Sequence, residues 1–234
     1  MLFPQQIIPI YIGRKHSLKL ISDLPKSGKK YIVLVAQRDG SLENPTKKDL
    51  YEYGTLAMVM KVFDMPDNSK SAIVQGISRV KILDYTNQEP YFSAAVESME
   101  DEPITDGLEV DALAANLRQA FDELMKVAPN LTEEHSGMLK NIQKPNRLTD
   151  RAISVITISN QEKQEILEEL NVKKRIEKAL NLISREIQRI KLGEEIQSEV
   201  HDEITKTQRE YYLREQMKAI KKELGEDEGS VETK

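Results

Sequence analysis

The chain has 234 residues, 39% of them hydrophobic and 31% charged, so it can bury a core, and its length suggests one or two domains. A formal net charge of -5 argues against a protein that binds nucleic acid by neutralising phosphates. The absence of cysteine excludes disulfides, thiolate metal sites and cysteine nucleophiles.

No apolar run in the sequence reaches the roughly 20 residues that a helix needs to cross a bilayer. The N-terminal stretch MLFPQQIIPIYIGRKHS also lacks the order of charged, apolar and small residues that marks a secretion signal. We therefore expect a cytoplasmic protein without a membrane partner.

Residues 1–100 alternate β-branched and aromatic runs with turn residues, which predicts a β-rich domain, either a small barrel or a curled sheet. In KKYIVLVAQRDGS, the continuous apolar centre from Tyr31 to Ala36 is typical of a strand buried on both faces. The segment YGTLAMVMKVFDMPDNSKSAIVQGISRVKILDY predicts two long strands joined by a turn at 66–69, where Asn68 tolerates a left-handed backbone. A last strand is expected at PYFSAAVESME.

Several apolar residues near this turn raise the question of a binding surface. Methionine is soft and unbranched and suits a surface that accepts many partners. We expect Met58 and Met60 to line the core of the domain, whereas Phe63 and Met65 fit a core position and an exposed tip equally well. Phe63, Met65 and Pro66 are therefore the candidate substrate contacts.

The stretch 101–107 is acidic and contains Pro and Gly, which indicates a linker. Residues 108–171 then change to helical spacing and predict a helical bundle. Leu113, Leu117, Phe121 and Leu124 lie on one face of its first helix. Shorter helices are expected at LTEEHSGMLKNI, RLTDRAISVITI and QEKQEILEEL.

Residues 172–225 predict one long helix, on the order of 80 Å at ~1.5 Å per residue, much of which must project from a small domain. Its first part has an apolar seam with heptad spacing, typical of a coiled coil, formed by Ile176, Leu180, Ile183, Ile187 and Ile190. A kink in this helix would be expected near Gly193. The seam returns at Leu213, Met217, Ile220 and Leu224, and residues 226–234 read as a flexible linker.

Two features suggest a ligand site at first sight, a possible phosphate-binding loop and the histidines, and neither fits the pattern that such a site requires. LPKSGKK contains Gly28-Lys29, but a phosphate-binding loop needs a glycine five residues earlier and a Ser or Thr after the lysine, where Asp23 and Lys30 stand. The histidines at positions 16, 135 and 201 have no partner at metal-ligand spacing and are expected at the surface or at helix caps. We predict no catalytic residue, no cofactor site and no metal site in this chain.

The sequence resembles one family closely. QREYYLREQMKAIKKELGE, residues 208–226, is similar to the helix that precedes the ATPase module of Lon proteases, which are ATP-dependent, homo-oligomeric serine proteases. IPIYIGRKHS, IVLVAQRD, YGTLAMVMKVFDMPD and VQGISRVKI resemble successive blocks of the Lon N-terminal domain, in the same order. The resemblance covers essentially the whole chain and is strongest at residues 4–83 and 205–226.

The resemblance implies an α+β fold: a PUA-like β-rich lobe, a helical bundle and a long projecting C-terminal helix that leads to an AAA+ ATPase and a protease domain with a Ser-Lys dyad. We expect an N-terminal region without those two parts, so that ATP and Mg belong to the missing ATPase module. It also implies a homo-oligomer, a hexamer in the full-length family. The lack of a transit peptide favours a bacterial over an organellar source.

By the same resemblance, the long helix makes contacts between subunits or domains. The candidate contact residues are Tyr211, Tyr212, Leu213, Met217, Ile220 and Leu224.

Three functions remain open at this point. The first is recognition of unfolded or tagged protein substrates, combined with assembly of the protease. The second is a structural coiled-coil spacer or docking module that binds no substrate. The third is RNA binding, which some PUA-like folds perform and which the acidic charge balance disfavours. Substrate identity and the oligomeric state of the chain do not follow from the sequence.

Overall fold

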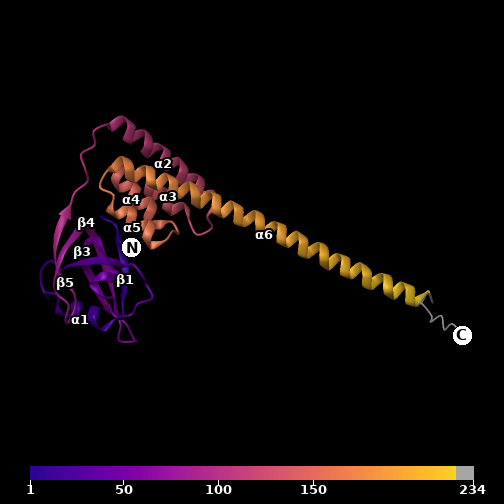
Figure 1. Ribbon diagram of the computed structural model, residues 1–234, viewed down its shortest axis with the longest axis horizontal. Helices are drawn as coiled ribbons and strands as arrows, with labels where there is room; N and C mark the ends of the chain where they lie inside the picture. The colour runs from indigo at the N-terminus through magenta and orange to yellow at the C-terminus, as the bar shows by residue number, and fades with distance from the viewer. Residues whose placement is uncertain (225–234) are drawn as a thin grey trace. The chain divides into compact units, whose positions relative to one another are not determined.

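The computed structural model describes residues 1–224. The chain divides into two compact units, Met1–Ile187 and Gln188–Lys234. Unit 1 contains a sheet followed in the chain by helices (Figure 1), which confirms the α+β class. The expected linker at 226–234 lies outside the described residues. No helix within residues 1–224 combines the length and the apolar character that a membrane crossing requires.

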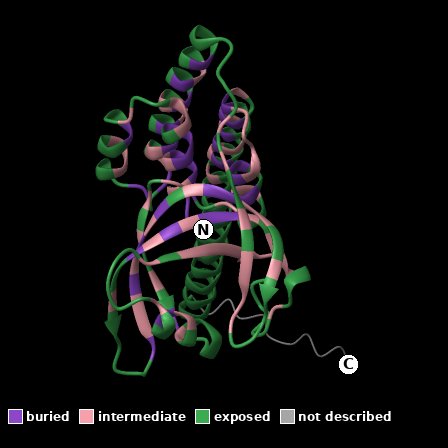
Figure 2. Cartoon of the chain, turned by 90° about the vertical axis from the view of Figure 1, so that its left-hand side faces the viewer, coloured by how far each residue is buried: buried purple, intermediate pink, exposed green. Residues whose placement is uncertain are grey.

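The sheet has five antiparallel strands in the order β1-β4-β3-β2, and β5 also pairs with β4. The strands are β1 (Ile7–Ile12), β2 (Tyr31–Gln37), β3 (Leu50–Asp64), β4 (Lys70–Asn87) and β5 (Ser93–Met99). Strand β4 is long enough to pair with β1 through residues 70–75 and with β5 through residues 79–87. The register shifts in β3 and β4 accompany the strong curvature of the sheet in Figure 2, as β-bulges do in general.

The turn between β3 and β4 forms where the sequence predicts it. Asn68 has a φ of 62°, the left-handed conformation that asparagine tolerates better than most residues. The Met65 amide donates to the Ser69 carbonyl at 3.0 Å and the Asn68 amide donates to the Met65 carbonyl at 3.2 Å, which closes the loop. This turn fixes the register of the two longest strands of the sheet.

The prediction that strand β2 is buried on both faces is wrong. Its residues are exposed or half-buried along the whole strand, so it is not buried on both faces. The reason is its position at the edge of the sheet, where β3 is its one strand partner among the described residues. One face of β2 packs Ile32 and Leu34 toward the core, while on the other face Tyr31 is exposed and Val33 and Val35 are half-buried.

Helix α1 (Lys15–Asp23) and the short 3-10 helix η1 (Lys47–Asp49) were not predicted from the sequence. Helix α1 buries Ile21 and packs Leu18, Leu20 and Leu24 against the concave face of the sheet. Its nine residues lie between strand-like segments, and a helix this short gives a weak periodic signal. It matters because it completes the core of the sheet.

The helical part of unit 1 follows the predicted order. Its helices are α2 (Gly107–Val127), α3 (Glu133–Lys140), α4 (Pro145–Val155) and α5 (Asn160–Glu168), and α6 (Val172–Glu223) begins there. Leu117, Phe121 and Leu124 are buried, while Leu113 is half-buried. Side chains cap several helix starts: Asp106 accepts from the Glu109 amide at 3.0 Å, Ser159 forms a capping box at the start of α5, and Asn171 accepts from the Lys174 amide at 3.1 Å at the start of α6.

Helix α6 is one continuous helix through Gly193. Within unit 1, Ile176 and Ile183 are completely buried and Leu180 is half-buried, so the first heptads of the predicted seam pack within the chain. This stretch of the seam is therefore buried without a second copy of the chain.

Gly76 offers a test of how tightly the N-terminal segment packs on the sheet. A Cβ atom added at Gly76 would lie 2.3 Å from the carbonyl oxygen of Phe3, which is itself buried. We expect Gly76→Ala to lower the free energy of unfolding by about 1–3 kcal/mol in urea denaturation, because backbone atoms must move to admit the methyl group. Gly107→Ala is the matched control, because a Cβ there meets nothing within 4 Å. Equal stability of the two variants would contradict the packing described here.

Candidate functional site

The tip of the β3–β4 hairpin carries the predicted contact residues. Phe63 and Met65 are 39% and 41% exposed, and Pro66 is exposed beside them. Asp67 holds the turn in shape, because its carboxylate accepts from the Ser69 amide at 3.1 Å and from the Tyr11 hydroxyl at 3.1 Å. The hydrogen bond from the Ser69 hydroxyl is the main cause of the lowered pKa of Asp67. The apolar tip is therefore presented on a well-ordered turn.

The prediction that Met60 lines the core is also wrong, because its side chain is 52% exposed. Ala57 and Val59 point inward and are buried, so the alternation of the strand directs Met58 and Met60 outward. Met58 is half-buried. The register shifts between Val59 and Lys61, which leaves Met60 as the extra residue of a bulge at the surface.

Exposed apolar side chains gather on the outer face of the sheet, opposite the core. Inward positions on β1 and β2 are Ile8, Ile10, Ile32 and Leu34, so the residues between them point outward. The exposed apolar residues on this side, which we call the outer-face patch, are Ile7, Tyr11, Tyr31, Met60, Phe63 and Met65.

The pairing register brings members of the outer-face patch together although they are distant in sequence. Tyr11 and Phe63 both pair with Ser71, and Tyr31 pairs with Met58. The Lys61 ammonium lies 4.8 Å from the centroid of the Phe63 ring, which adds one cation to the patch. Of the six members, Ile7, Tyr11, Tyr31 and Met60 were missed as site residues. Their outward alternation was visible in the sequence, but the pairing of β1 and β2 was not.

Nothing in residues 1–224 gathers three or more His, Asp or Glu side chains in a way that could hold a metal ion. The stretch 24–30 forms the connection between α1 and β2, and Gly28 adopts a φ of 85° there. His16 contacts the Pro90 carbonyl at 2.7 Å, and His135 contacts the amide of Thr132 at the start of α3.

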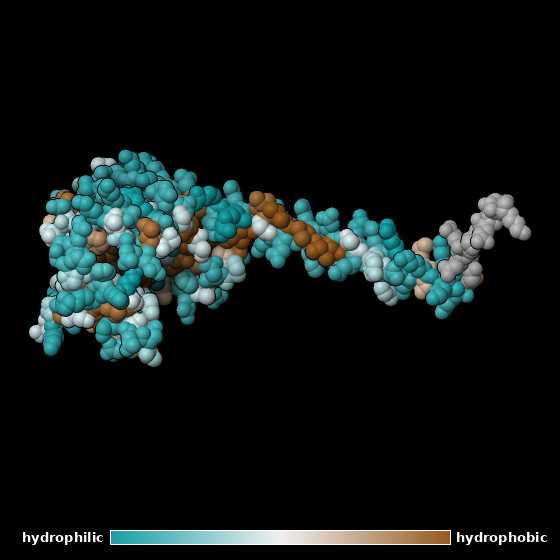
Figure 3. Space-filling view, turned by 60° about the horizontal axis from the view of Figure 1, so that its bottom comes forward, coloured by the Kyte–Doolittle hydropathy of each residue, from teal (hydrophilic) through white to brown (hydrophobic). Residues whose placement is uncertain are grey.

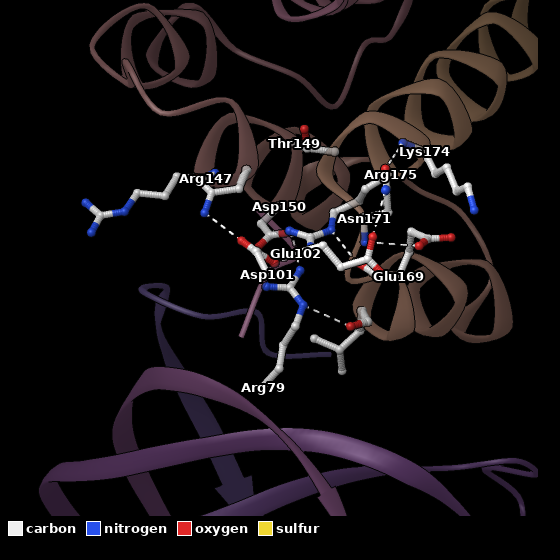
Figure 4. A network of polar contacts seen from close by, with 12 residues as sticks. Arg79, Asp101, Glu102, Arg147, Thr149, Asp150, Glu169, Asn171, Lys174 and Arg175 are labelled. Atoms are coloured by element: carbon white, nitrogen blue, oxygen red, sulfur yellow. Dashed lines mark hydrogen bonds and ion pairs between the residues drawn. The ribbon is translucent and has the colours of Figure 1, made fainter. Parts of the chain in front are cut away.

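A buried ionic network joins the sheet to the helices within unit 1 (Figure 4). Arg79 of β4 donates to the Asp150 carboxylate of α4 at 2.6 Å and to the Leu167 carbonyl at 2.9 Å. Arg175, at the start of α6, is fully buried and bonds to Asp101 in the linker. Its second nitrogen lies 3.7 Å from Asp150. We call these four residues the junction network.

The two carboxylates of the junction network differ in burial, and their pKa values shift in opposite directions. Burial raises the pKa of Asp150, against the charges of Arg79 and Arg175. Burial acts in the same direction on the less enclosed Asp101, but the hydrogen bond and charge of Arg175 outweigh it and lower the pKa of Asp101. Each charge therefore depends on its partner to remain buried.

Unit 2 presents the second group of predicted contact residues. Exposed apolar side chains recur along α6 in two groups, which together we call the apolar stripe: Leu192, Ile196, Val200 and Ile204, followed by Leu213, Met217, Ile220 and Leu224 (Figure 3). All six predicted helix contacts are exposed, namely Tyr211, Tyr212, Leu213, Met217, Ile220 and Leu224. Their roles as contacts stay a prediction, but each is available for one.

The fold and these surfaces define an α+β domain with an apolar sheet face open to solvent. The sequence profile of the ATP-dependent protease La (LON) substrate-binding domain matches residues 1–185. The chain belongs to this family.

Individual relatives agree with that assignment. The chain is 40% identical over 232 residues to a Lon protease of Koribacter versatilis and 38% identical over 226 residues to one of Dictyoglomus thermophilum. The matches cover 99% and 97% of this chain but 28% of each relative, so the chain spans about a quarter of their length.

Solved structures show the same fold. The N-terminal domain of a Mycobacterium avium complex Lon protease has a TM-score of 0.61 at 17% identity, over 79% of this chain and 92% of that one. A Lon N-terminal domain protein from Xanthomonas campestris gives a TM-score of 0.52 at 17% identity, over 77% and 91% of the two chains.

The junction network yields a pH-dependent prediction for Arg79→Met. Removing Arg79 leaves Asp150 buried with less compensation, so its folded-state pKa rises further above the unfolded value. Between those two pKa values the folded state binds more protons, and the free energy of unfolding falls as pH rises. We expect a loss of about 3–5 kcal/mol at neutral pH that shrinks toward about pH 4.

The measurement is urea denaturation of both proteins across this pH range. Lys19→Met is the matched control, because it removes an exposed pair with Asp23 at 2.9 Å and should cause no measurable loss. Asp101 also loses the charge of Arg79, which helps to lower its pKa, so its share of the loss likewise shrinks at acidic pH. A loss for Arg79→Met that is constant with pH would show that Asp150 does not carry the effect.

Proposed function

We propose that this chain is the substrate-recognition and assembly region of an ATP-dependent Lon-type serine protease that degrades damaged, misfolded or tagged proteins. The outer-face patch is the observation that carries the recognition role. Its six apolar side chains are exposed on a protein in which 31% of residues are charged. Such a patch is what a partner with exposed apolar segments would cover.

The composition of the patch suits many different partners. Met60 and Met65 can change shape to fit, and the aromatic side chains at Tyr11, Tyr31 and Phe63 supply contact area. Covering partly exposed side chains of this kind contributes on the order of a few kcal/mol in total. That magnitude corresponds to weak, reversible capture, which fits a region that hands its substrate on.

The assembly role rests on a different observation, the apolar stripe on α6. The residues from Leu192 to Leu224 in this stripe are exposed in unit 2, and covering them would favour association with another copy or another domain. A chain that uses only this stripe would be a coiled-coil spacer without substrate binding, which is the alternative function.

The chemistry of the whole protein is also part of the proposal. The relatives are called Lon proteases, and the chain corresponds to 28% of them. We assign ATP, Mg and the Ser-Lys dyad to the remaining length of the parent protein, and the hexamer to its complete form. Within this chain, the expected partners are unfolded or tagged polypeptides.

The recognition role predicts the effect of a Phe63→Ser, Met65→Ser double variant. We expect binding of a permanently unfolded protein, followed by analytical ultracentrifugation, to weaken about tenfold, because two exposed apolar contacts are lost. Leu108→Ser is the matched control, since Leu108 is 86% exposed on α2, outside the outer-face patch. Equal binding by wild type and the double variant would place capture elsewhere.

The assembly role predicts the behaviour of a Met217→Glu, Ile220→Glu variant. Charges within the apolar stripe should abolish concentration-dependent self-association in sedimentation equilibrium, because they would be buried without partners. Ser198→Glu, Gln216→Glu adds the same charge at exposed positions outside the apolar seam. If both variants associate like wild type, the stripe does not mediate assembly of this chain.

A further inference from the structure

A cavity of about 980 Å³ lies beside strand β2. It is bounded by the end of β1, helix α1, strand β2, the end of β4 and the start of β5. All five consecutive residues from Tyr31 to Val35 line it. Because successive side chains of a strand point to opposite faces, contact with all five means that the cavity reaches the backbone edge of β2.

The backbone groups on that edge can be identified from the pairing. The Val59 amide donates to the Lys30 carbonyl at 2.8 Å, so this pair is hydrogen-bonded. In an antiparallel ladder the bonded pairs recur every second residue, which assigns Ile32 and Leu34 to the bonds with β3. The N–H and C=O groups of Tyr31, Val33 and Val35 therefore point away from β3, toward the cavity edge.

These outward groups are free to accept a new strand. Across the described residues, no hydrogen bond from another segment reaches the backbone of Tyr31, Val33 or Val35. The strand is exposed or half-buried along its length, so solvent reaches this edge. A row of unpaired N–H and C=O groups is a template for pairing with an extended chain.

The wall of the cavity indicates which side chains such a chain would carry. Ile32 and Leu34 face the concave side, and Ile82 and Phe92 line the same cavity from β4 and from just before β5. Phe92 packs against the Tyr85 ring at a centroid distance of 5.3 Å. Alternate side chains of an added strand would meet this apolar wall, while those between them would face outward.

One charge at the rim is not balanced by an acid. Arg14 donates to the Gln37 side chain at 2.7 Å and to the Leu42 carbonyl at 3.1 Å, both neutral acceptors. Its guanidinium has no carboxylate partner within the described chain, whereas Asp23, the acid that lines the cavity, is paired with Lys19 at 2.9 Å. Arg14 lies near the C-terminal end of β2, so it complements an acidic group at that end.

We propose that β2 captures substrate by strand addition: an extended segment with apolar side chains at alternate positions pairs antiparallel with the edge at Tyr31, Val33 and Val35. An acidic residue near its N-terminal end meets Arg14. This inference rests on the proposed recognition function and specifies how the substrate binds. The added strand uses the backbone for affinity, so it tolerates many sequences.

A synthetic peptide tests the geometry directly. It has alternating valine and threonine after an N-terminal glutamate, with valine toward the cavity, and its affinity for the intact chain is measured by fluorescence polarisation. The threonine N–H groups would then face β2. N-methylation of every threonine should weaken binding roughly tenfold or more, whereas N-methylation of every valine should leave it within about twofold.

Variants of the chain supply the second arm. Val33→Pro removes an N–H that points away from β3, so the ladder between β2 and β3 stays intact and the peptide should bind roughly tenfold more weakly. Val33→Ala loses side chain but keeps the N–H, and should bind within about twofold of wild type. Arg14→Met should weaken the glutamate peptide, and it should not affect a peptide with glutamine in that place.

The outcomes separate this inference from the recognition function. If the methylated peptides bind alike, or if the parent peptide does not bind, strand addition at β2 is overturned. Capture of unfolded protein through the outer-face patch is then tested only by the binding measurement on the Phe63→Ser, Met65→Ser variant. If the threonine-methylated peptide loses affinity while unfolded protein is not captured, the edge site is real and the recognition function is wrong.

Discussion

Two buried arginines connect segments of unit 1 that are far apart in the chain. Arg79 ties β4 to α4 and to the end of α5, and Arg175 ties the start of α6 to the linker after β5. Removing such charges from water is costly, and the cost is offset only when every partner is in place. The junction network therefore ties the sheet to the helices within unit 1. The outer face and the β2 edge remain uncovered in that arrangement.

The same sheet provides two different kinds of surface because strand side chains alternate. Ala57, Val59 and Val74 fill the core, and the residues between them reach solvent on the other side. The bulge at Met60 adds one more exposed apolar residue to that side. At the edge of the sheet, β2 contributes backbone groups in place of side chains. The outer face offers side-chain contacts that accept many sequences, and the β2 edge offers backbone contacts that do not depend on sequence. Both suit the proposed binding of polypeptides that share no motif.

Local chemistry made much of this fold predictable. The turn at Asn68, the two strands on either side and the order of the helices follow from residues close together in the sequence. The status of β2 did not, because an apolar run looks the same in a central strand and in an edge strand whose outer face is open. Met60 was misplaced because the alternation along β3 does not say which of its two faces meets the core, and that depends on the neighbouring strands. The outer-face patch combines Tyr11, Tyr31 and Phe63 through pairings between distant segments, which a single sequence does not reveal.

Helix α6 is stabilised in two different ways along one continuous backbone. Its beginning is held by burial, as Ile176 and Ile183 show, whereas the residues beyond Ile187 are exposed or half-buried and rely on helix propensity. Helices without tertiary packing are only marginally stable in water, so amide hydrogen exchange should become faster along α6 toward its C-terminal end. Any partner that covers the stripe would also slow this exchange. A partner bound to the stripe would thus make the backbone of α6 more ordered, and this effect requires no movement of the sheet.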